Sequence, residues 1–178
     1  HGLARLTNEA LTFGTAAMDA NSLAERFESV GAQFSTSAAR DMAIVSLRTL
    51  TEADWMEDAV GALTELLAAP AFPEEDLARG RRQLLQALQR ERQEPGSVAT
   101  RRFYQLMYRE HPYANPVLGN DATLPTLTRD EVAGFFRTYY TAGNAVLALT
   151  GAIERDAAEE LAGRIARALP QGERAPEL

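Results

Sequence analysis

The sequence has 178 residues, a length that suits one domain, and its 46% hydrophobic content is that of an ordinary globular protein. It contains no cysteine, which excludes disulfides and thiolate metal sites, and its net charge of -7 argues against nucleic acid as a partner. No apolar run approaches the roughly 18 residues of a membrane-spanning helix, so none is predicted. The compartment stays open, since a soluble protein of a bacterial periplasm or cytoplasm fits equally well.

The chain opens with a predicted helix in the stretch from Gly2 to Thr15. Apolar residues recur in it at steps of three and four, which gives the helix one apolar face. These residues are Leu3, Leu6, Ala10 and Phe13. Gly14 fits the C-terminal stop of the helix, because glycine adopts the left-handed conformation there without strain.

Further helices and a few strands follow from the hydrophobic pattern. Helices are expected over residues 22–30, 52–69, 74–94, 97–109, 128–140 and 155–169. Strands are expected over 32–38 and 41–50, joined by a tight turn at Ala39-Arg40, and over 144–152, which is apolar on both faces and is therefore predicted to be a central strand. Two capping boxes are expected: Asn21 or Ser22 with Glu25, and Thr128 with Glu131.

Three motifs carry a resemblance to a known family. Gly2-Leu3-Ala4 and Gly14-Thr15 frame the first helix as in the pattern G-[LI]-A-H-x-x-E-H-x-x-x-x-G-T. The loop 111–119 is similar to H-P-Y-x-x-P-x-x-G, and residues 139–151 are similar to Y-Y-x-x-x-N-x-x-L-x-x-x-G. The chain thus resembles the pitrilysin/insulinase-type zinc metallopeptidases from Gly2 to about Leu169.

The resemblance implies an α+β domain over residues 1–169, half of a clamshell, with a mixed, mainly antiparallel sheet and helices packed on it. Residues 170–178 are predicted to be a linker. One or two strands precede the first helix in this family, so we expect the N-terminal strands to be cut off from this sequence. In the family the histidine of the H-P-Y loop packs that loop, and the same structural role is expected for His111.

The residues that would form the zinc site in the family are replaced. Its two histidines, its general base and its third ligand correspond to Arg5, Glu9, Asn8 and Ala87 respectively. Arginine has no lone pair for zinc, asparagine cannot take a proton from a bound water, and the single carboxylate of Glu9 is not a site. We therefore predict no catalytic residue and no metal ligand in this chain.

In the family, the strand that matches 32–38 is an edge to which an extended substrate peptide adds, and this implies peptide contacts at Phe34, Ser35 and Thr36. A plain edge strand is the alternative.

The first hypothesis for function is a non-catalytic domain that forms one wall of a peptide-binding chamber. It would pair with a homologous zinc-bearing domain or subunit and contact unfolded peptide, and zinc is expected only in that partner. Arg5 and Glu9 are then expected to pair on the chamber face. Two alternatives stay open: a zinc endopeptidase with a displaced metal site, or a core scaffold subunit of a processing complex without a proteolytic partner.

Overall fold

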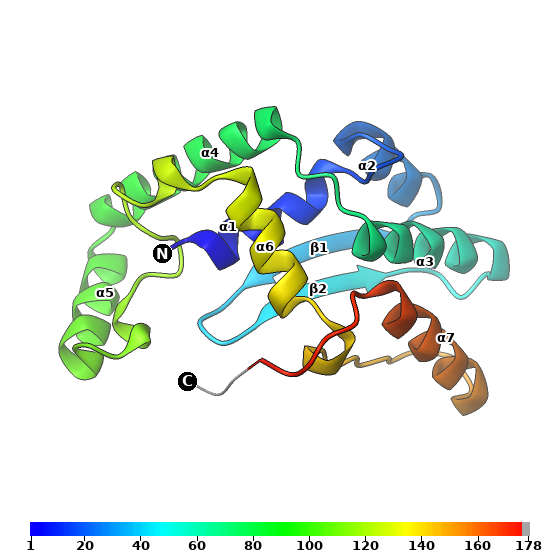
Figure 1. The fold of residues 1–178 in the computed structure, drawn as a ribbon. Helices are drawn as coiled ribbons and strands as arrows, with labels where there is room; N and C mark the ends of the chain where they lie inside the picture. The colour runs from blue at the N-terminus through cyan, green and yellow to red at the C-terminus, as the bar shows by residue number, and fades with distance from the viewer. Residues whose placement is uncertain (176–178) are drawn as a thin grey trace.

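The computed structural model describes residues 1–175, and Figure 1 shows how their helices surround a short hairpin. The helices are α1 (Leu3–Ala10), α2 (Ala20–Ser29), α3 (Ala53–Ala68), α4 (Glu74–Gln93), α5 (Pro95–Tyr108), α6 (Arg129–Tyr139) and α7 (Arg155–Ala168). The strands are β1 (Gln33–Ala38) and β2 (Ala43–Arg48), and short 3-10 turns lie at Leu11–Phe13, Pro112–Ala114, Leu124–Thr126 and Ala142–Asn144. The predicted α+β class is confirmed, and the sheet within residues 1–175 consists of these two antiparallel strands.

Helix α1 lies at the centre of the fold, where it contacts α4, α6 and the hairpin (Figure 1). Its apolar stripe faces inward as predicted, because Leu6 and Ala10 are fully buried. Helix α4 approaches α1 closely: a Cβ on Gly80 would stand 3.2 Å from Leu6 and 3.1 Å from Phe13. The small residue at position 80 therefore lets the two helices pack against each other.

The end of the first helix differs from the prediction. Helix α1 stops at Ala10, a 3-10 turn follows, and Gly14 adopts φ 108° with an extended ψ of -178°, so it is not a left-handed helix cap. A side chain at Gly14 would strike the carbonyl oxygen of Met18. Glycine is needed here because the chain folds back tightly on itself, with the Thr15 amide donating to the Met18 carbonyl over 2.8 Å.

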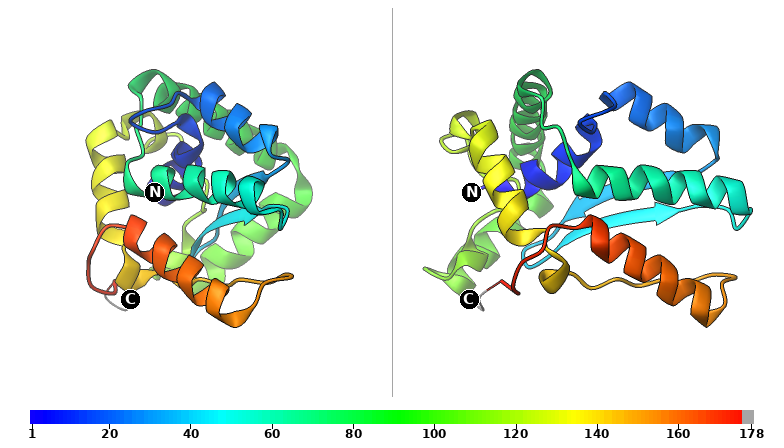
Figure 2. Two further views of the ribbon diagram at one scale, coloured as in Figure 1. Left: turned by 90° about the vertical axis from the view of Figure 1, so that its right-hand side faces the viewer. Right: turned by 45° about the vertical axis from the view of Figure 1, so that its right-hand side comes forward.

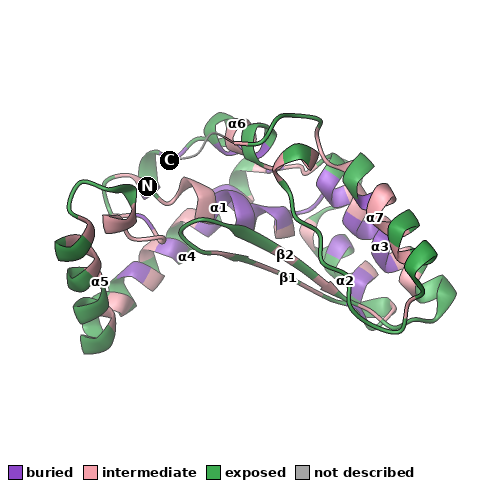
Figure 3. Cartoon of the chain, turned by 90° about the horizontal axis from the view of Figure 1, so that it is seen from below, coloured by how far each residue is buried: buried purple, intermediate pink, exposed green. Residues whose placement is uncertain are grey.

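Strands β1 and β2 form the predicted hairpin, in the register Phe34 opposite Leu47 and Ser35 opposite Ser46. Alternate residues face the two sides, as the two-residue period of a strand requires. Phe34, Val45 and Leu47 pack partly buried against the core. The other side of the hairpin is exposed in the view of Figure 3.

Helices α2, α3 and α7 form one side of the molecule (Figure 2). The predicted capping box at the start of α2 is wrong: the helix begins earlier, and Asp19 caps it by accepting from the Ser22 amide over 2.7 Å. Arg26 then ties α2 to α3, since it donates to Asp58 over 2.8 Å and to Glu65 over 2.9 Å.

Helices α4 and α5 lie on the other side, and α6 crosses the middle of the molecule beside α1 (Figure 1). The capping box of α6 is confirmed, with Thr128 and Glu131 each bonded to the other's backbone amide. Helix α5 is unlike its neighbours because none of its residues is buried. It is held mainly by α4 and by the 3-10 turn at Pro112–Ala114.

The strand predicted over residues 144–152 is wrong. After the 3-10 turn at Ala142–Asn144 the chain runs to α7 without regular structure, and Val146 is 98% exposed. A strand needs a neighbour for its backbone hydrogen bonds, whereas a helix makes them within itself. No neighbouring strand lies along this segment within residues 1–175.

Residues 170–175 of the predicted linker lie against the turn at Ala142–Asn144. The Ala142 amide donates to the Pro170 carbonyl over 3.0 Å, and the Ala175 amide donates to the Asn144 side chain over 3.0 Å. Residues 176–178 of that linker lie outside the described residues. No helix within the described part of the chain is long and apolar enough to cross a membrane.

Candidate functional site

At the position of the family's general base, Asn8 makes a buried set of hydrogen bonds between distant parts of the chain. Asn8 is 1% exposed, although it is a polar residue. Its Nδ2 group donates to the Ser37 carbonyl over 2.5 Å and to the Ile44 carbonyl over 3.3 Å, and its Oδ1 accepts from the Tyr140 hydroxyl over 2.9 Å. Asn8 thus joins α1 to both strands of the hairpin and to the end of α6.

This arrangement needs an amide. A carboxylate only accepts hydrogen bonds, so an ionised Asp or Glu could bond Tyr140 but would face two carbonyl oxygens without a donor. Burial also raises the pKa of Tyr140, because an ionised phenolate would lose its hydration. The hydroxyl therefore stays protonated and keeps its role as the donor to Asn8.

Arg5 and Glu9, at the positions of the two family histidines, lie one turn apart on α1. As expected they approach each other, with Arg5 Nε 3.7 Å from Glu9 Oε2 and side chains 32% and 24% exposed. Burial raises the pKa of Glu9, and the charge of Arg5 opposes that shift. The result is a weak ion pair at the position of the family's metal ligands.

The side chains present do not fit a zinc ion. The family's third ligand position is Ala87 on α4, which has no donor atom. Glu9 is then the one group at these positions that could bind a metal, and Arg5 beside it would repel the cation. Within residues 1–175 no three His, Asp or Glu side chains gather where a metal ion could be held.

The predicted peptide contacts lie on β1, next to a surface hollow. Phe34 points inward and stacks on Phe27 of α2 with a ring distance of 4.9 Å, Thr36 is half-buried on the same side, and Ser35 is exposed on the other side. The hollow has a volume of about 390 Å³ and is lined by α2 and the start of β1, including Leu23, Phe27 and Phe34. The backbone of β1 bonds to β2, and its second edge makes no backbone hydrogen bond within residues 1–175.

His111 lies in the loop after α5. Its Nδ1 accepts from the Tyr113 amide over 3.2 Å, and its ring packs at 4.7 Å from the Tyr113 ring, so it stabilises the start of a 3-10 turn. No carboxylate and no nucleophilic hydroxyl bonds this imidazole within the described residues. The contacts are those of the structural role expected for His111.

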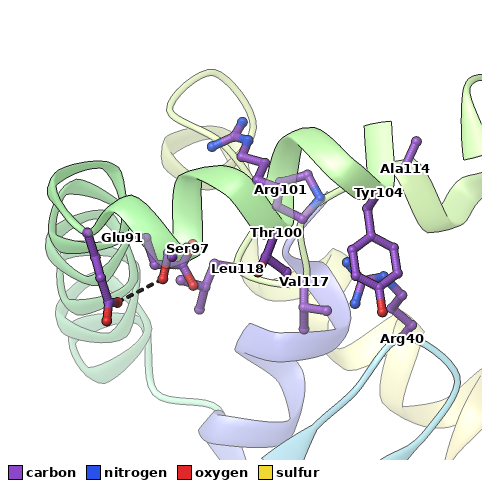
Figure 4. Close-up of a pocket in the computed structure, with 12 residues that line it drawn as sticks. Arg40, Glu91, Ser97, Thr100, Arg101, Tyr104, Ala114, Val117 and Leu118 are labelled. Carbon is purple, nitrogen blue, oxygen red and sulfur yellow. Dashed lines mark hydrogen bonds between the residues drawn. The ribbon is translucent and has the colours of Figure 1, made fainter. Parts of the chain in front are cut away.

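A second hollow, of about 340 Å³, lies between α5 and the hairpin tip (Figure 4). Arg40 at the tip stacks its guanidinium 3.5 Å from the centre of the Tyr104 ring on α5 and donates to the Tyr113 carbonyl over 3.2 Å. Asp41 accepts from the Tyr113 hydroxyl. These residues anchor α5 and its loop to the hairpin and form no pair of nucleophile and base.

Sequence reasoning missed the roles of Asn8, Tyr140 and Arg40. For the contact between Asn8 and Tyr140, the sequence signal was the family pattern, which has paired tyrosines at positions 139 and 140. Nothing in the pattern says which tyrosine reaches back to α1. The contact of Arg40 joins residues far apart in the sequence and had no local signal.

Comparison with known proteins agrees with this geometry. A family model described as Insulinase (Peptidase family M16) matches residues 1–121, and one described as Peptidase M16 inactive domain matches residues 126–177. A crystal structure of a peptidase M16 inactive domain from Pseudomonas fluorescens superposes with a TM-score of 0.96 at 36% identity, over 99% of this chain and 43% of that one.

Curated relatives are similar over most of this chain. An uncharacterized zinc protease from Rickettsia felis is 28% identical over 161 residues, which are 90% of this chain and 39% of the relative. A non-peptidase homolog, YmxG of Helicobacter pylori, is 25% identical over 171 residues, which are 96% of this chain and 39% of the relative. The chain thus spans about two fifths of the length of these relatives. It belongs to the insulinase family of peptidases, peptidase family M16.

Proposed function

We propose that this chain is a non-catalytic domain of a family M16 peptidase. In this proposal it forms one wall of a peptide-binding chamber and pairs with a homologous domain or subunit that carries the zinc ion. The observation that carries the proposal is Asn8: at the position of the general base stands a buried amide whose three hydrogen bonds hold the fold together. The position is used for structure and has no proton-accepting group for a water molecule.

The residues around Asn8 support the same proposal. Arg5 and Glu9 form an ion pair where zinc binding in the family uses two neutral imidazole ligands, and the side chain of Ala87 offers no ligand atom. The matched description of an inactive domain and the relative named as a non-peptidase homolog point the same way.

The first experiment measures zinc and cleavage together. After exhaustive dialysis the purified chain is expected to hold far less than one zinc ion per molecule and to leave a quenched fluorogenic peptide uncut. Addition of a zinc-bearing family M16 protein from the same genome is expected to give more cleavage than that protein alone. One zinc per chain together with cleavage by the chain alone would contradict the proposal and favour a displaced zinc site.

The same mixture tests the remaining alternative. If the chain forms a stable complex with other proteins but never changes the activity of a zinc-bearing homologue, the pairing proposed here is refuted and a scaffold role in a processing complex is favoured.

The peptide-binding wall is proposed to include the free edge of β1. An extended peptide can add to that edge through backbone hydrogen bonds, while the hollow beside Phe27 and Phe34 would receive one of its side chains. Phe34→Ala is expected to weaken binding of fluorescein-labelled denatured casein, because it removes one wall of the hollow. Phe103→Ala, which removes an exposed phenyl ring from α5, is the matched control and should bind as the wild type does.

A further inference from the structure

The end of the molecule formed by α5 and the C-terminal part of α4 is basic. Residues 79–109, which we call the basic arm, contain eight arginines and two glutamates and so have a net charge of +6, whereas the net charge of the whole chain is -7. Three of these arginines form ion pairs with acidic side chains. The other five make no ion pair within residues 1–175: Arg82, Arg90, Arg101, Arg102 and Arg109.

Helix α5 also exposes an apolar stripe. Phe103, Leu106 and Met107 are 56%, 60% and 63% exposed, and their spacing of three and four residues places them on one face of the helix. The opposite face carries Tyr108, which packs on Tyr113 and holds the helix to the loop that follows it. Single apolar residues on a surface are ordinary, but three large ones in a stripe beside unpaired arginines are typical of a protein-binding surface.

The other end of the molecule is acidic and also exposes apolar side chains. Figures 1 and 2 show that the starts of α3 and α7 lie at the end opposite α5. Residues 52–58 and 154–160, at these helix starts, contain eight acidic residues and one arginine, and we call this region the acidic end. Acidic residues stabilise the dipole at the start of a helix, which explains the charge but not the neighbouring apolar groups. Leu50 is 51% exposed there, and Trp55, the single tryptophan of the chain, is 46% exposed.

The two ends are complementary. Each combines exposed apolar side chains with charges of one sign, and the two signs are opposite, so contact between them removes apolar surface from water and pairs arginines with carboxylates. Tryptophan and arginine are the residue types that contribute most to such contacts. Two basic arms packed together would instead bring the unpaired arginines of both copies close to each other. An anionic membrane would face a chain whose net charge is -7. The charges therefore favour the acidic end of a second copy as the occupant of the α5 stripe.

We propose that copies of this chain associate head to tail, with the apolar stripe of α5 in one copy docked on the acidic end of the next. Such a contact joins two different surfaces, so a dimer keeps one free basic arm and one free acidic end, and further copies add until a ring closes or a filament grows. The contact uses neither the edge of β1 nor the surroundings of Asn8. It is therefore independent of the function proposed above, and either proposal can fail alone.

Sedimentation velocity of the purified chain at low salt tests the association. The sedimentation coefficient is expected to rise with protein concentration and to reach species of more than two copies, because every assembled copy leaves both kinds of end available. In about 0.5 M salt the association is expected to weaken by about tenfold, since the paired charges lie at the rim of the contact and are screened.

Two variants locate the contact. Leu106→Glu and Trp55→Glu each place a carboxylate against the apolar side chains of the other end, and each is expected to weaken self-association by about tenfold or more. An equimolar mixture of the two is expected to form a dimer with one copy of each and nothing larger, because the acidic end of the first variant and the basic arm of the second are intact. Val146→Glu, the same change at a residue that is 98% exposed and lies in neither end, is the matched control and should associate as the wild type does.

Several results would overturn the proposal. One is a chain that stays a single copy at low salt up to about 200 μM, a concentration at which even weak specific contacts form. Another is a dimer that Leu106→Glu dissociates and Trp55→Glu does not, which would mean that α5 packs on α5 of the second copy. A mixture of the two variants that stays monomeric would exclude a contact between different ends. Binding to vesicles of anionic lipid without self-association, lost in Leu106→Glu, would identify a membrane as the occupant of the stripe.

Discussion

Asn8→Asp tests the buried hydrogen bonds of Asn8, because it replaces the side-chain NH2 group by an oxygen atom. The substitution keeps the shape of the side chain and replaces the Nδ2 donor by an oxygen. The bonds to the Ser37 and Ile44 carbonyls, of 2.5 Å and 3.3 Å, are lost, while the bond from the Tyr140 hydroxyl is kept. The rest of the fold is expected to stay the same in this variant.

The expected loss is large because the site is only 1% exposed. Two hydrogen bonds contribute about 1 kcal/mol each, and a buried carboxylate that keeps only the bond from Tyr140 and has no counter-charge brings the total to about 3–5 kcal/mol. This is a sizeable part of the roughly 5–15 kcal/mol that stabilises a typical domain.

The loss should depend on pH. Burial beside two carbonyl oxygens raises the pKa of the new carboxyl, so the folded variant binds its proton more tightly than the unfolded chain does. The deficit is therefore smallest at low pH, where the protonated carboxyl can donate one bond again, and it grows as the pH rises above about 4.

Urea unfolding followed by circular dichroism at pH 4 and pH 7 measures the effect. Asn21→Asp, the same change at an exposed position on α2, is the control and should alter the free energy of unfolding by no more than about 0.5 kcal/mol. If Asn8→Asp is as stable as that control at pH 7, or loses the same amount at both pH values, the structural role assigned to Asn8 is refuted.

Three further predictions use other parts of the fold. Gly14→Ala is expected to cost at least about 2 kcal/mol in thermal or urea unfolding, because φ there is 108° and the new methyl group meets the Met18 carbonyl, whereas Gly134→Ala in α6, where the methyl group meets nothing, should be neutral or stabilising. Arg26→Ala removes the bonds to two carboxylates on α3 and is expected to cost about 1 kcal/mol, less in high salt; a loss independent of salt would argue against the ion pairs. Burial raises the pKa of Glu9 above 4.5, so its charge costs stability as the pH rises through and beyond that value, and Glu9→Gln should raise the free energy of unfolding at pH 7 but hardly at pH 3.

The helices and the hairpin could be predicted from the sequence because their signals are local. Helical periodicity, the capping pair of Thr128 and Glu131, and the alternation in β2 all act within a few residues, and the structure has each of them. The replacement of the zinc ligands is also visible in the sequence, since Arg5 has no lone pair for the metal, Asn8 cannot serve as the base, and the carboxylate of Glu9 alone is not a site.

Two local features differ from the prediction, although the contacts that set them lie within five residues. Asp19 and not Ser22 caps α2, although both residue types cap helices. The helix begins at Ala20, earlier than the hydrophobic pattern indicates. The backbone at Gly14 is set by its approach to residues 18 and 19, so the glycine serves a tight fold of the chain and not a helix end.

The sequence by itself determined the helices, the hairpin and which residue types stand at the family's zinc positions, because these follow from residue type and short-range spacing. Only the tertiary structure decided the role of Asn8 and the state of residues 145–150. Asn8 contacts residues 29, 36 and 132 positions away in the sequence. Residues 145–150 have the composition of a central strand, but a strand forms only beside a partner, and the partner is a property of the assembled sheet.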